Sequence, residues 1–481
     1  MLTGFQRRLL VWASLAISSV SLLAQQTAGP KNQVAATPPL GWNSWDAYGL
    51  TITESQFRAN VDVLRNKLKP YGWEYAVIDE GWFLENPQTR PTPEKLVYAI
   101  DAHGRYVPVP ARFPSAGVAG KTSSVTGHTA PGETNSVTME ETSFSALGAY
   151  VHAQGLKFGI HIVRGIPRVS VARDLPIEGS SFHATDLTDK ADLCPWDPTN
   201  YGVKDNAAGQ AWYDSLIRQC AGWGVDLIKV DCISDRPYKL SEIQQIRRAI
   251  DKTGRPMLLS LSPGPTALSH AAEVSGLSNM WRIADDHWDV WSSGGKAFPQ
   301  GVKDQFARLA AWEPFAGPGH WPDADMLPIG QLKPVPGWGA PRASGLTPDE
   351  QRTEVTLWAI ARSPLIIGGN LTLLDPATTA LLTNREVLRI SQTALHSAEV
   401  LHEGDLIAWR ADMPGGGKAI ALFNLGETEI APSKLLSDFG ADLSGRDWKV
   451  SDVWDGGAAV AGRQFVERIP PHGCVLLLLE L

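Results

Sequence analysis

Lys229 and Asp231 place an amine and a carboxylate two residues apart inside an apolar run, residues 226–232. The run predicts a short buried strand, and Gly224 marks its start. Side chains two apart in a strand point to the same side, so these groups lie together toward the strand's C-terminal end. Buried charges must pair, so this pattern alone fits a structural ion pair as well as a site of chemistry.

Several other strand-like runs also end in polar or charged side chains. Residues 75–82, for example, are apolar until Asp79 and Glu80. If the strands are parallel neighbours, their C-terminal ends meet at one edge, and the groups at those ends come together. The set gathered there is Asp79, Glu80, His161, Lys229, Asp231, Ser262, Arg282, Asp286 and Asp325. This clustering favours a functional site over a set of isolated ion pairs.

The set is rich in carboxylates and poor in metal ligands. The sequence has no HxH, HExxH or clustered Cys/His pattern, so we expect no metal and no cofactor. It also has no Gly-rich phosphate loop and no GxSxG motif. What remains is carboxylate chemistry on a polyhydroxylated substrate. Glycoside hydrolysis needs two carboxyl groups that flank the scissile bond, about 5–5.5 Å apart in retaining enzymes.

The elements that position these residues form a repeating pattern. Apolar runs alternate with amphipathic helical patterns across residues 37–396, which predicts a (β/α)8 TIM barrel, an α/β fold. The predicted strands lie near residues 40–45, 75–82, 157–163, 226–231, 257–261, 280–286, 320–327 and 364–368. We expect capping boxes at Thr53–Gln56, Ser241–Gln244 and Thr347–Glu350. Residues 84–142 and 164–194 are expected to form long irregular loops.

The pattern changes in the last part of the chain. Residues 397–481 contain short strand-like runs separated by Gly and Pro turns, which predict a small C-terminal antiparallel β-sandwich domain. This part offers no convergent set of ionisable groups. Its expected role is to pack against the barrel.

The N-terminus and the composition indicate an exported protein. Arg7 and Arg8 precede an apolar run, which predicts a signal peptide over residues 1–24 and then a polar linker, residues 25–36. The run is short for a membrane span, so we expect a secreted or periplasmic protein with no membrane contact after cleavage. A net charge of −8 without a basic cluster argues against a nucleic-acid partner.

Five blocks of the chain resemble, in the same order, the motifs of glycoside hydrolase family 27, the α-galactosidase or melibiase family. They are Thr37–Trp45, Ile78–Trp82, Asp226–Asp231, Trp281–Asp286 and Pro322–Leu327. The similarity extends over about residues 37–481. It implies a catalytic barrel with a C-terminal β-domain, and a secreted retaining exo-glycosidase that hydrolyses terminal α-D-galactosyl residues. The implied partner is a carbohydrate, such as a galactoside or a plant-derived oligo- or polysaccharide.

The resemblance also assigns roles to residues. Asp231 matches the family's nucleophile, and Asp286, four residues after Arg282, matches its acid/base. The residue types agree, since Lys229 favours an ionised Asp231, and the negative Asp231 helps to keep Asp286 protonated. The implied substrate-binding residues are Trp45 under the sugar, Asp79 and Lys229 at O4, Arg282 at O2, with Glu80, His161, Ser262 and Asp325, the last at the rim of the site.

Departures from the family pattern keep other substrates open. Glu80 stands where a second Asp is usual, and its longer side chain would crowd C6 of galactose, so a β-L-arabinopyranosidase is the nearest alternative to an α-galactosidase. Ser262 leaves room at C2, as in α-N-acetylgalactosaminidases, and His161 stands where a Tyr is common. Outside this class, a non-catalytic carbohydrate-binding barrel is the alternative, although such a protein has no need of both Asp231 and Asp286.

The four cysteines do not form a disulfide scaffold. The resemblance implies a bridge between Cys194 and Cys232, next to the nucleophile. Cys220 lies on a predicted helix and is expected to be a buried thiol. Cys474 is expected in the core of the small domain.

Overall fold

The computed structural model describes residues 34–87, 96–117, 127–128, 136–139, 141–334, 337–457, 460–461, 463–465 and 467–481. The predicted signal peptide, residues 1–24, and most of the predicted linker, residues 25–36, lie outside these ranges. Within them, no helix has the length and apolar character needed to cross a bilayer.

Eight parallel strands form the central sheet, and each of the first six pairs with the next of the eight along the chain. They are β1 (Leu40–Asn43), β2 (Tyr75–Ile78), β6 (Lys157–Val163), β10 (Leu227–Asp231), β11 (Leu258–Leu261), β12 (Met280–Arg282), β13 (Trp321–Asp323) and β16 (Leu365–Ile367). The last strand, β16, pairs back with β1. A bridge between Leu327 and Ile367 joins the segment after β13 to β16. The sheet therefore closes, and the predicted (β/α)8 barrel is confirmed.

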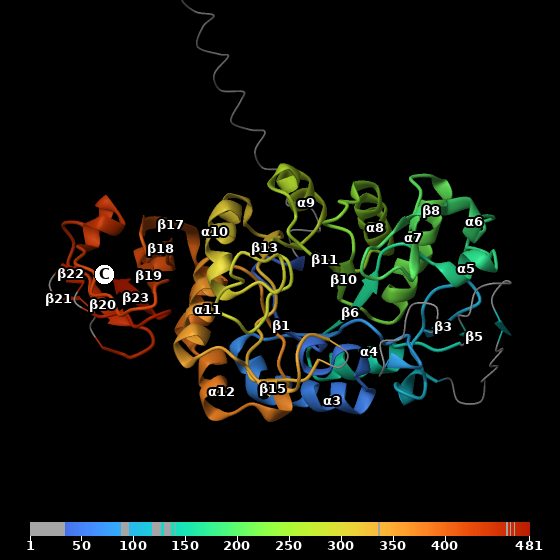
Figure 1. Ribbon diagram of the computed structural model, residues 1–481, viewed down its shortest axis with the longest axis horizontal. Coiled ribbons are helices and arrows are strands. Elements are labelled where there is room, and N and C mark those ends of the chain that lie inside the picture. Colours follow the sequence, from blue (N-terminus) through green and yellow to red (C-terminus); the bar gives the residue numbers. More distant parts are fainter. Residues whose placement is uncertain are drawn as a thin grey trace, which may run out of the picture.

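Helices cover the outside of this sheet (Figure 1). The following helices lie between successive strands of the eight: α3 (Glu54–Val63), α4 (Ser145–Ala153), α7 (Ala207–Gly222), α8 (Leu240–Thr253), α9 (Ala271–Leu277), α10 (Val302–Trp312) and α11 (Pro348–Ile360). The capping boxes at Thr53–Gln56 and Thr347–Glu350 are confirmed. The one predicted at Ser241 is wrong, because α8 begins one residue earlier, and no side chain caps it.

The barrel interior changes from apolar to charged along the strands. In β10, Leu227, Lys229 and Asp231 alternate with Ile228 and Val230, so these three share the inner face. A buried apolar cluster fills the end where the strands begin; it contains Tyr75, Val77, Leu227, Leu258, Met280, Trp321 and Ile366. Charged residues can therefore occupy only the other end of the barrel, where the strands finish.

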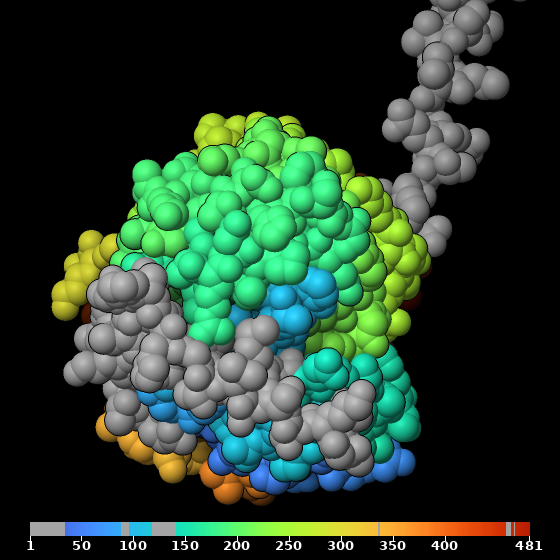
Figure 2. Space-filling view, turned by 90° about the vertical axis from the view of Figure 1, so that its right-hand side faces the viewer, coloured from blue at the N-terminus to red at the C-terminus, as the bar shows by residue number. Residues whose placement is uncertain are grey.

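The two predicted irregular loops contain small sheets, so that prediction is wrong. β3 (Val97–Ile100) pairs with β5 (Ser136–Met139), and β5 with β4 (Gly127–His128). In the second segment, β7 (Ile166–Pro167) and β8 (Thr188–Leu193) pair with β9 (Asn200–Val203), which lies just beyond it. Most of these strands are short and pair with distant segments, so the local sequence carries no clear period. Both sheets lie at the right of Figure 1, and Figure 2 looks onto that side of the molecule.

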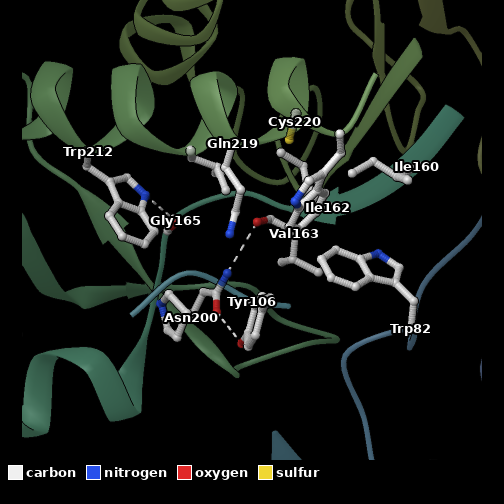
Figure 3. A pocket seen from close by; sticks show the side chains of 13 residues that line it. Trp82, Tyr106, Ile160, Ile162, Val163, Gly165, Asn200, Trp212, Gln219 and Cys220 are labelled. Carbon is white, nitrogen blue, oxygen red and sulfur yellow. Dashed lines mark hydrogen bonds between the residues drawn. The ribbon is translucent and has the colours of Figure 1, made fainter. Parts of the chain in front are cut away.

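Residues 164–203, called the insert below, are fastened to the end of β6. Asn200 donates hydrogen bonds from Nδ2 to the carbonyls of Val163 (3.2 Å) and Arg164 (3.0 Å), and it accepts one from Tyr106 Oη at 2.8 Å (Figure 3). Gly165 has a φ of +93°, and a Cβ there would lie 2.3 Å from the Tyr201 carbonyl oxygen. The chain therefore turns sharply at the barrel edge, and β9 packs directly against that turn.

Behind β6, the helix α7 covers the barrel and leaves a small apolar cavity of about 20 Å³ (Figure 3). Trp212 and Cys220 of α7 face Ile160 and Ile162 of β6 across it. Trp212 Nε1 donates to the Gly165 carbonyl at 3.0 Å. The cavity has room for little more than one water molecule, so it is a packing defect rather than a substrate site.

The C-terminal domain contains a five-stranded antiparallel sheet in the order β17-β18-β19-β23-β20. Its strands are β17 (Leu395–Glu403), β18 (Leu406–Asp412), β19 (Lys418–Asn424), β20 (Lys449–Asp452) and β23 (Cys474–Glu480). Phe306 of α10 packs edge-on against Phe423 of β19, with ring centroids 5.0 Å apart. Thr353 of α11 donates to the His472 carbonyl at 2.7 Å. The domain thus packs on α10 and α11, at the left of Figure 1.

Candidate active site

A cavity of about 300 Å³ opens at the C-terminal ends of the barrel strands. The strand ends bring the predicted site residues together there, since every one of them lines this cavity: Trp45, Asp79, Glu80, His161, Lys229, Asp231, Ser262, Arg282, Asp286 and Asp325. Its size suits one sugar ring together with part of a leaving group.

The deepest part of the cavity is a closed ionic network around Asp79. Lys229 Nζ lies 2.8 Å from Asp79 Oδ2, and Asn43 Nδ2 donates to the same oxygen at 2.7 Å. The Glu80 N–H donates to the other oxygen at 2.8 Å. Burial raises the pKa of Asp79, but the charge and hydrogen bond of Lys229, together with His161 and the Glu80 N–H, outweigh burial and hold that pKa well below its usual range. Asp79 is therefore a fixed carboxylate that can accept hydrogen bonds from sugar hydroxyls.

Asp231 ends β10 with its carboxylate held at both oxygens. The Cys232 N–H donates to Oδ1 at 2.7 Å, and Trp196 Nε1 donates to Oδ2 at 3.4 Å. His161 Nε2 lies 3.6 Å from Oδ2. Burial raises the pKa of Asp231, but His161, Lys229 and the Cys232 N–H outweigh it and hold the pKa below its ordinary value. Asp231 is therefore ionised at neutral pH, as a nucleophile must be.

Asp286 has the opposite electrostatic environment. Enclosure by the cavity raises its pKa to about 6, and the negative charges of Asp325 and Asp231 add to the rise against the opposing charge of Arg282. Its side chain is still 45% exposed, because it faces the open cavity. A bound sugar would exclude that water and favour the protonated form further. Asp286 is therefore suited to donate a proton near neutral pH.

Arg282 connects Asp286 to the buried wall of the site. Arg282 Nη2 lies 3.2 Å from Asp286 Oδ1 and 2.7 Å from Asp325 Oδ2. The His287 N–H donates to the same Asp325 oxygen at 2.8 Å. Asp325 has a φ of +88° and is buried, so it lies deeper than the rim position implied by the family resemblance. The guanidinium is thus fixed by two carboxylates before any substrate arrives.

Trp45, Glu80 and Ser262 complete the wall around the charged groups. Trp45 and Glu80 are half-buried, and Ser262 is buried. A Ser side chain at this position occupies little of the cavity, whereas Glu80 extends from the residue directly after Asp79. Ser262 therefore leaves more of the cavity open than Glu80 does.

The disulfide between Cys194 and Cys232 is present, as the resemblance implied. It ties the insert to the residue after Asp231, and so it holds Trp196 next to the Asp231 carboxylate. Cys220 is free and buried, as the sequence predicts. Cys474 is also free and buried, but it packs against the barrel rather than in the small domain's own core, and its Sγ donates to Thr356 Oγ1 of α11 at 3.4 Å.

Other lining residues were not predicted as site residues from the sequence: Asp46, Trp196, Arg236, Asp285, His287, Trp288, Phe298 and Met326. The sequence contained a signal that could have placed Trp196 in the site: Trp196 follows Cys194 by two residues, and Cys194 was expected next to Asp231. Arg236 and Phe298 had none, since each lies on a loop whose path depends on tertiary contacts. Asp289, outside the cavity lining, has a buried carboxylate that pairs with the partly exposed Arg342 at 2.5 Å.

Comparison with known proteins agrees with this geometry. The family model described as α-galactosidase A matches residues 202–393, and that of the α-galactosidase C-terminal β-sandwich domain matches residues 403–479. The structure of a family 27 β-L-arabinopyranosidase from Geobacillus stearothermophilus is similar over 94% of this chain and 98% of its own, with 38% identity and a TM-score of 0.83. The chain belongs to glycoside hydrolase family 27.

Curated relatives of this family 27 glycoside hydrolase differ in their named substrates. An α-galactosidase A from Cellvibrio japonicus is 26% identical over 96% of this chain and 97% of its own length. An α-N-acetylgalactosaminidase from Gallus gallus is also 26% identical, over 93% of this chain and 95% of its own. Family membership therefore fixes the reaction class, while the sugar depends on details of the cavity wall.

Proposed function

We propose that this family 27 enzyme is a retaining exo-glycosidase that removes terminal sugars with the ring configuration of galactose, and that it prefers β-L-arabinopyranosides. The observation that carries the preference is Glu80, which lines the cavity directly after the Asp79–Lys229 pair. The 38% identity to an arabinopyranosidase, against 26% to the α-galactosidase from C. japonicus, supports the same choice.

In the first step, one oxygen of Asp231 attacks the anomeric carbon, and the bond from that carbon to the leaving oxygen breaks. Asp286 transfers its proton to that oxygen, so the leaving group departs as a neutral alcohol. The low pKa of Asp231 and the raised pKa of Asp286 keep each residue in the required protonation state.

In the second step, water attacks the anomeric carbon of the glycosyl–Asp231 ester. Asp286, now a carboxylate, accepts a proton from that water, and Asp231 leaves as a carboxylate. Both residues are then in their starting forms. Two displacements at one carbon retain the anomeric configuration, and NMR of the first-formed product measures this directly.

The preference for arabinopyranose follows from the size of Glu80. β-L-Arabinopyranose has the ring hydroxyls of α-D-galactose but lacks C6. Glu is one methylene longer than Asp, and one methylene in a packed pocket is worth about 1–3 kcal/mol of discrimination. The Asp79–Lys229 pair would bind the hydroxyls common to both sugars.

The test compares wild type with Glu80→Asp on the nitrophenyl glycosides of β-L-arabinopyranose and α-D-galactose. We expect wild type to prefer the arabinopyranoside, and Glu80→Asp to shift the kcat/KM ratio toward galactose by about 10- to 200-fold. Glu85→Asp, the same change outside the cavity lining, is the control. Equal ratios in wild type and Glu80→Asp contradict the proposed role of Glu80.

The second candidate is an α-D-galactosidase, supported by the curated relatives with that name. Substantial galactoside turnover by wild type, unaffected by Glu80→Asp, would favour it. An α-N-acetylgalactosaminide belongs in the same panel, because the small Ser262 leaves space at the cavity wall. A purely binding protein would hydrolyse none of these glycosides, with or without Asp231.

We also propose that the enzyme acts outside the cytoplasm. The basic and apolar residues 7–24 support export, and the Cys194–Cys232 disulfide fits an oxidising compartment. Cell fractionation with activity and N-terminal sequencing tests this, and a full-length product in the cytoplasm would contradict it.

A further inference from the structure

We propose that Glu354, on the outer helix α11, is a positioning residue for the acid/base: through His287 it fixes the loop that carries Asp286. This loop, residues 283–301, joins β12 to α10 and is called the acid/base loop below. The role rests on the proposed function, because it requires Asp286 to act as the acid. It explains a buried pair that the two displacement steps do not use.

Glu354 and His287 form a hydrogen-bonded pair that water does not reach. Glu354 Oε1 lies 2.6 Å from His287 Nε2, and both side chains are 0% exposed. Within the part of the chain that the structure describes, Glu354 Oε2 and His287 Nδ1 have no hydrogen-bond partner. Burial raises the pKa of Glu354, and the hydrogen bond and charge of His287 offset this rise only in part. Each side chain therefore depends on the other for its hydrogen bonding.

His287 directly follows Asp286 in the chain and is also connected to it through Arg282. The His287 N–H donates to Asp325 Oδ2 at 2.8 Å, and Arg282 Nη2 lies 2.7 Å from the same oxygen. Arg282 Nη2 also lies 3.2 Å from Asp286 Oδ1. A displacement of His287 would therefore move the Asp286 backbone and disturb the carboxylate that fixes Arg282.

Trp358 supports the same group of residues from the next turn of α11. Residues four apart lie on one face of a helix, so Trp358 and Glu354 face the same way. Trp358 Nε1 donates to the Asp325 carbonyl at 2.9 Å, and its ring centroid lies 5.2 Å from that of His287. The helix therefore holds both His287 and the backbone of Asp325.

Glu350, one turn before Glu354, extends this face of α11 to the far part of the acid/base loop. Glu350 Oε1 lies 2.7 Å from Nδ1 of His472, a residue of the C-terminal domain. The His472 ring stacks on Trp291 of the acid/base loop, with ring centroids 4.1 Å apart. α11 lies between the barrel and the C-terminal domain (Figure 1). The loop is thus supported along its length, and Glu354 acts next to Asp286.

Stability alone does not require polar side chains at these two positions. Replacing both partners of a buried hydrogen bond by apolar groups of the same shape is nearly neutral for stability. A hydrogen bond differs from an apolar contact because it fixes direction as well as separation. General acid catalysis depends on such precision, since a misplacement of about 1 Å can cost about 100-fold in rate. The pair therefore contributes orientation of the acid/base loop.

The experiment replaces both members of the pair, His287→Phe together with Glu354→Leu, so that no buried polar group loses its partner. Two glycosides of the sugar that wild type prefers are compared. The leaving oxygen of the methyl glycoside needs a proton, and that of the dinitrophenyl glycoside does not. We expect kcat/KM to fall on the order of 10- to 100-fold for the methyl glycoside and to stay close to wild type for the dinitrophenyl glycoside.

Two single variants test whether the hydrogen bond is responsible. Glu354→Gln should keep the wild-type ratio of the two substrates, because an amide can donate or accept at the same position. Glu354→Met removes the bond and should change the ratio as the double variant does, which gives the answer even if the double variant does not fold. The matched control is His402→Phe with Glu399→Leu, the same changes at a more exposed pair on β17.

Equal losses on both glycosides in the double variant or in Glu354→Met would overturn the positioning role, because they would show a general disturbance of the site. Wild-type kcat/KM on the methyl glycoside would overturn it as well, and so would a Glu354→Gln variant as defective as Glu354→Met. A wild type inactive on both glycosides would instead contradict the proposed function.

Discussion

The floor and the mouth of the cavity differ in how far their side chains are buried and in how completely their charges are paired. On the floor, Lys229 and Asp79 pair at 2.8 Å, Arg282 and Asp325 pair at 2.7 Å, and none of these side chains is more than 16% exposed. At the mouth, Arg236 and Phe298 are about half exposed. Buried, fully paired charges cannot adapt, so the floor can be selective for one sugar. Exposed groups on loops can accept several leaving groups.

The largest effect is expected where the floor performs the chemistry. Asp231→Asn removes the proposed nucleophile, and we expect kcat/KM to fall on the order of 10⁴-fold or more on every substrate, glycosyl fluoride included. The measurement is steady-state kinetics. Asp251→Asn, the same change on the exposed face of α8, is the control. If kcat/KM fell on disaccharides alone, Asp231 would act on the leaving group at the mouth of the cavity. The contrast between floor and mouth would then be wrong.

Asp286 lies where floor and mouth meet, so its replacement should depend on the leaving group. The acid must be protonated, so wild-type kcat/KM should fall as pH rises through about 6. It should also fall at low pH, below the ordinary Asp range, where Asp231 gains a proton. Asp286→Asn should remove the alkaline fall and cost about 10²–10⁴-fold on a disaccharide.

The same Asp286→Asn change should cost much less on a dinitrophenyl glycoside, whose leaving group needs no proton. The two pH profiles, measured side by side, give the result. An alkaline fall that persists in Asp286→Asn would mean that another group is the acid.

Lys229→Met tests how strongly the floor depends on pairing. It leaves the Asp79 charge buried without its partner, so we expect unfolding free energy to fall by about 3–5 kcal/mol at pH 7 in urea titrations. The exposed pair of Lys157 and Glu74 provides the control, Lys157→Met, expected to cost less than about 1 kcal/mol. If the two variants lost similar unfolding free energies, the buried pair on the floor would contribute no more to stability than an exposed pair.

The Lys229→Met deficit should also depend on pH. In wild type the pKa of Asp79 is depressed, so its contribution is present above the unfolded pKa and is lost as pH falls through the folded pKa. In the variant the pKa of Asp79 rises, so protonation relieves the buried charge. The difference between the two proteins should therefore narrow below about pH 4.

Cys194→Ser is expected to have the smallest effect on hydrolysis, and this effect should concern the mouth of the cavity. The disulfide closes a long loop, so we expect unfolding free energy to fall by about 2–4 kcal/mol. Because Trp196 loses its anchor, disaccharide hydrolysis should fall more than fluoride hydrolysis. Reductant should have the same effect on wild type and none on the variant. A matching loss on both substrates would mean that the disulfide supports the floor as well.

Much of the barrel could be predicted because its strands are locally encoded. Each is a short apolar run followed by a polar end, and helices such as α3 and α11 carry their start signals in adjacent residues. The insert could not be predicted in the same way. Strands such as β7 and β9 are held by pairing across about 30 residues and by Asn200, which no local pattern reveals.

The sequence by itself determined which groups come together, because alternation in β10 places Lys229 and Asp231 on one face, and parallel strands bring their ends together. Only the tertiary structure decided how those groups behave. The opposite pKa shifts of Asp231 and Asp286 depend on burial and on neighbours from other strands. The position of Trp196 likewise depends on a disulfide between residues 38 apart. Both effects depend on the distances between residues that are far apart in the chain, and the order of residues does not give those distances.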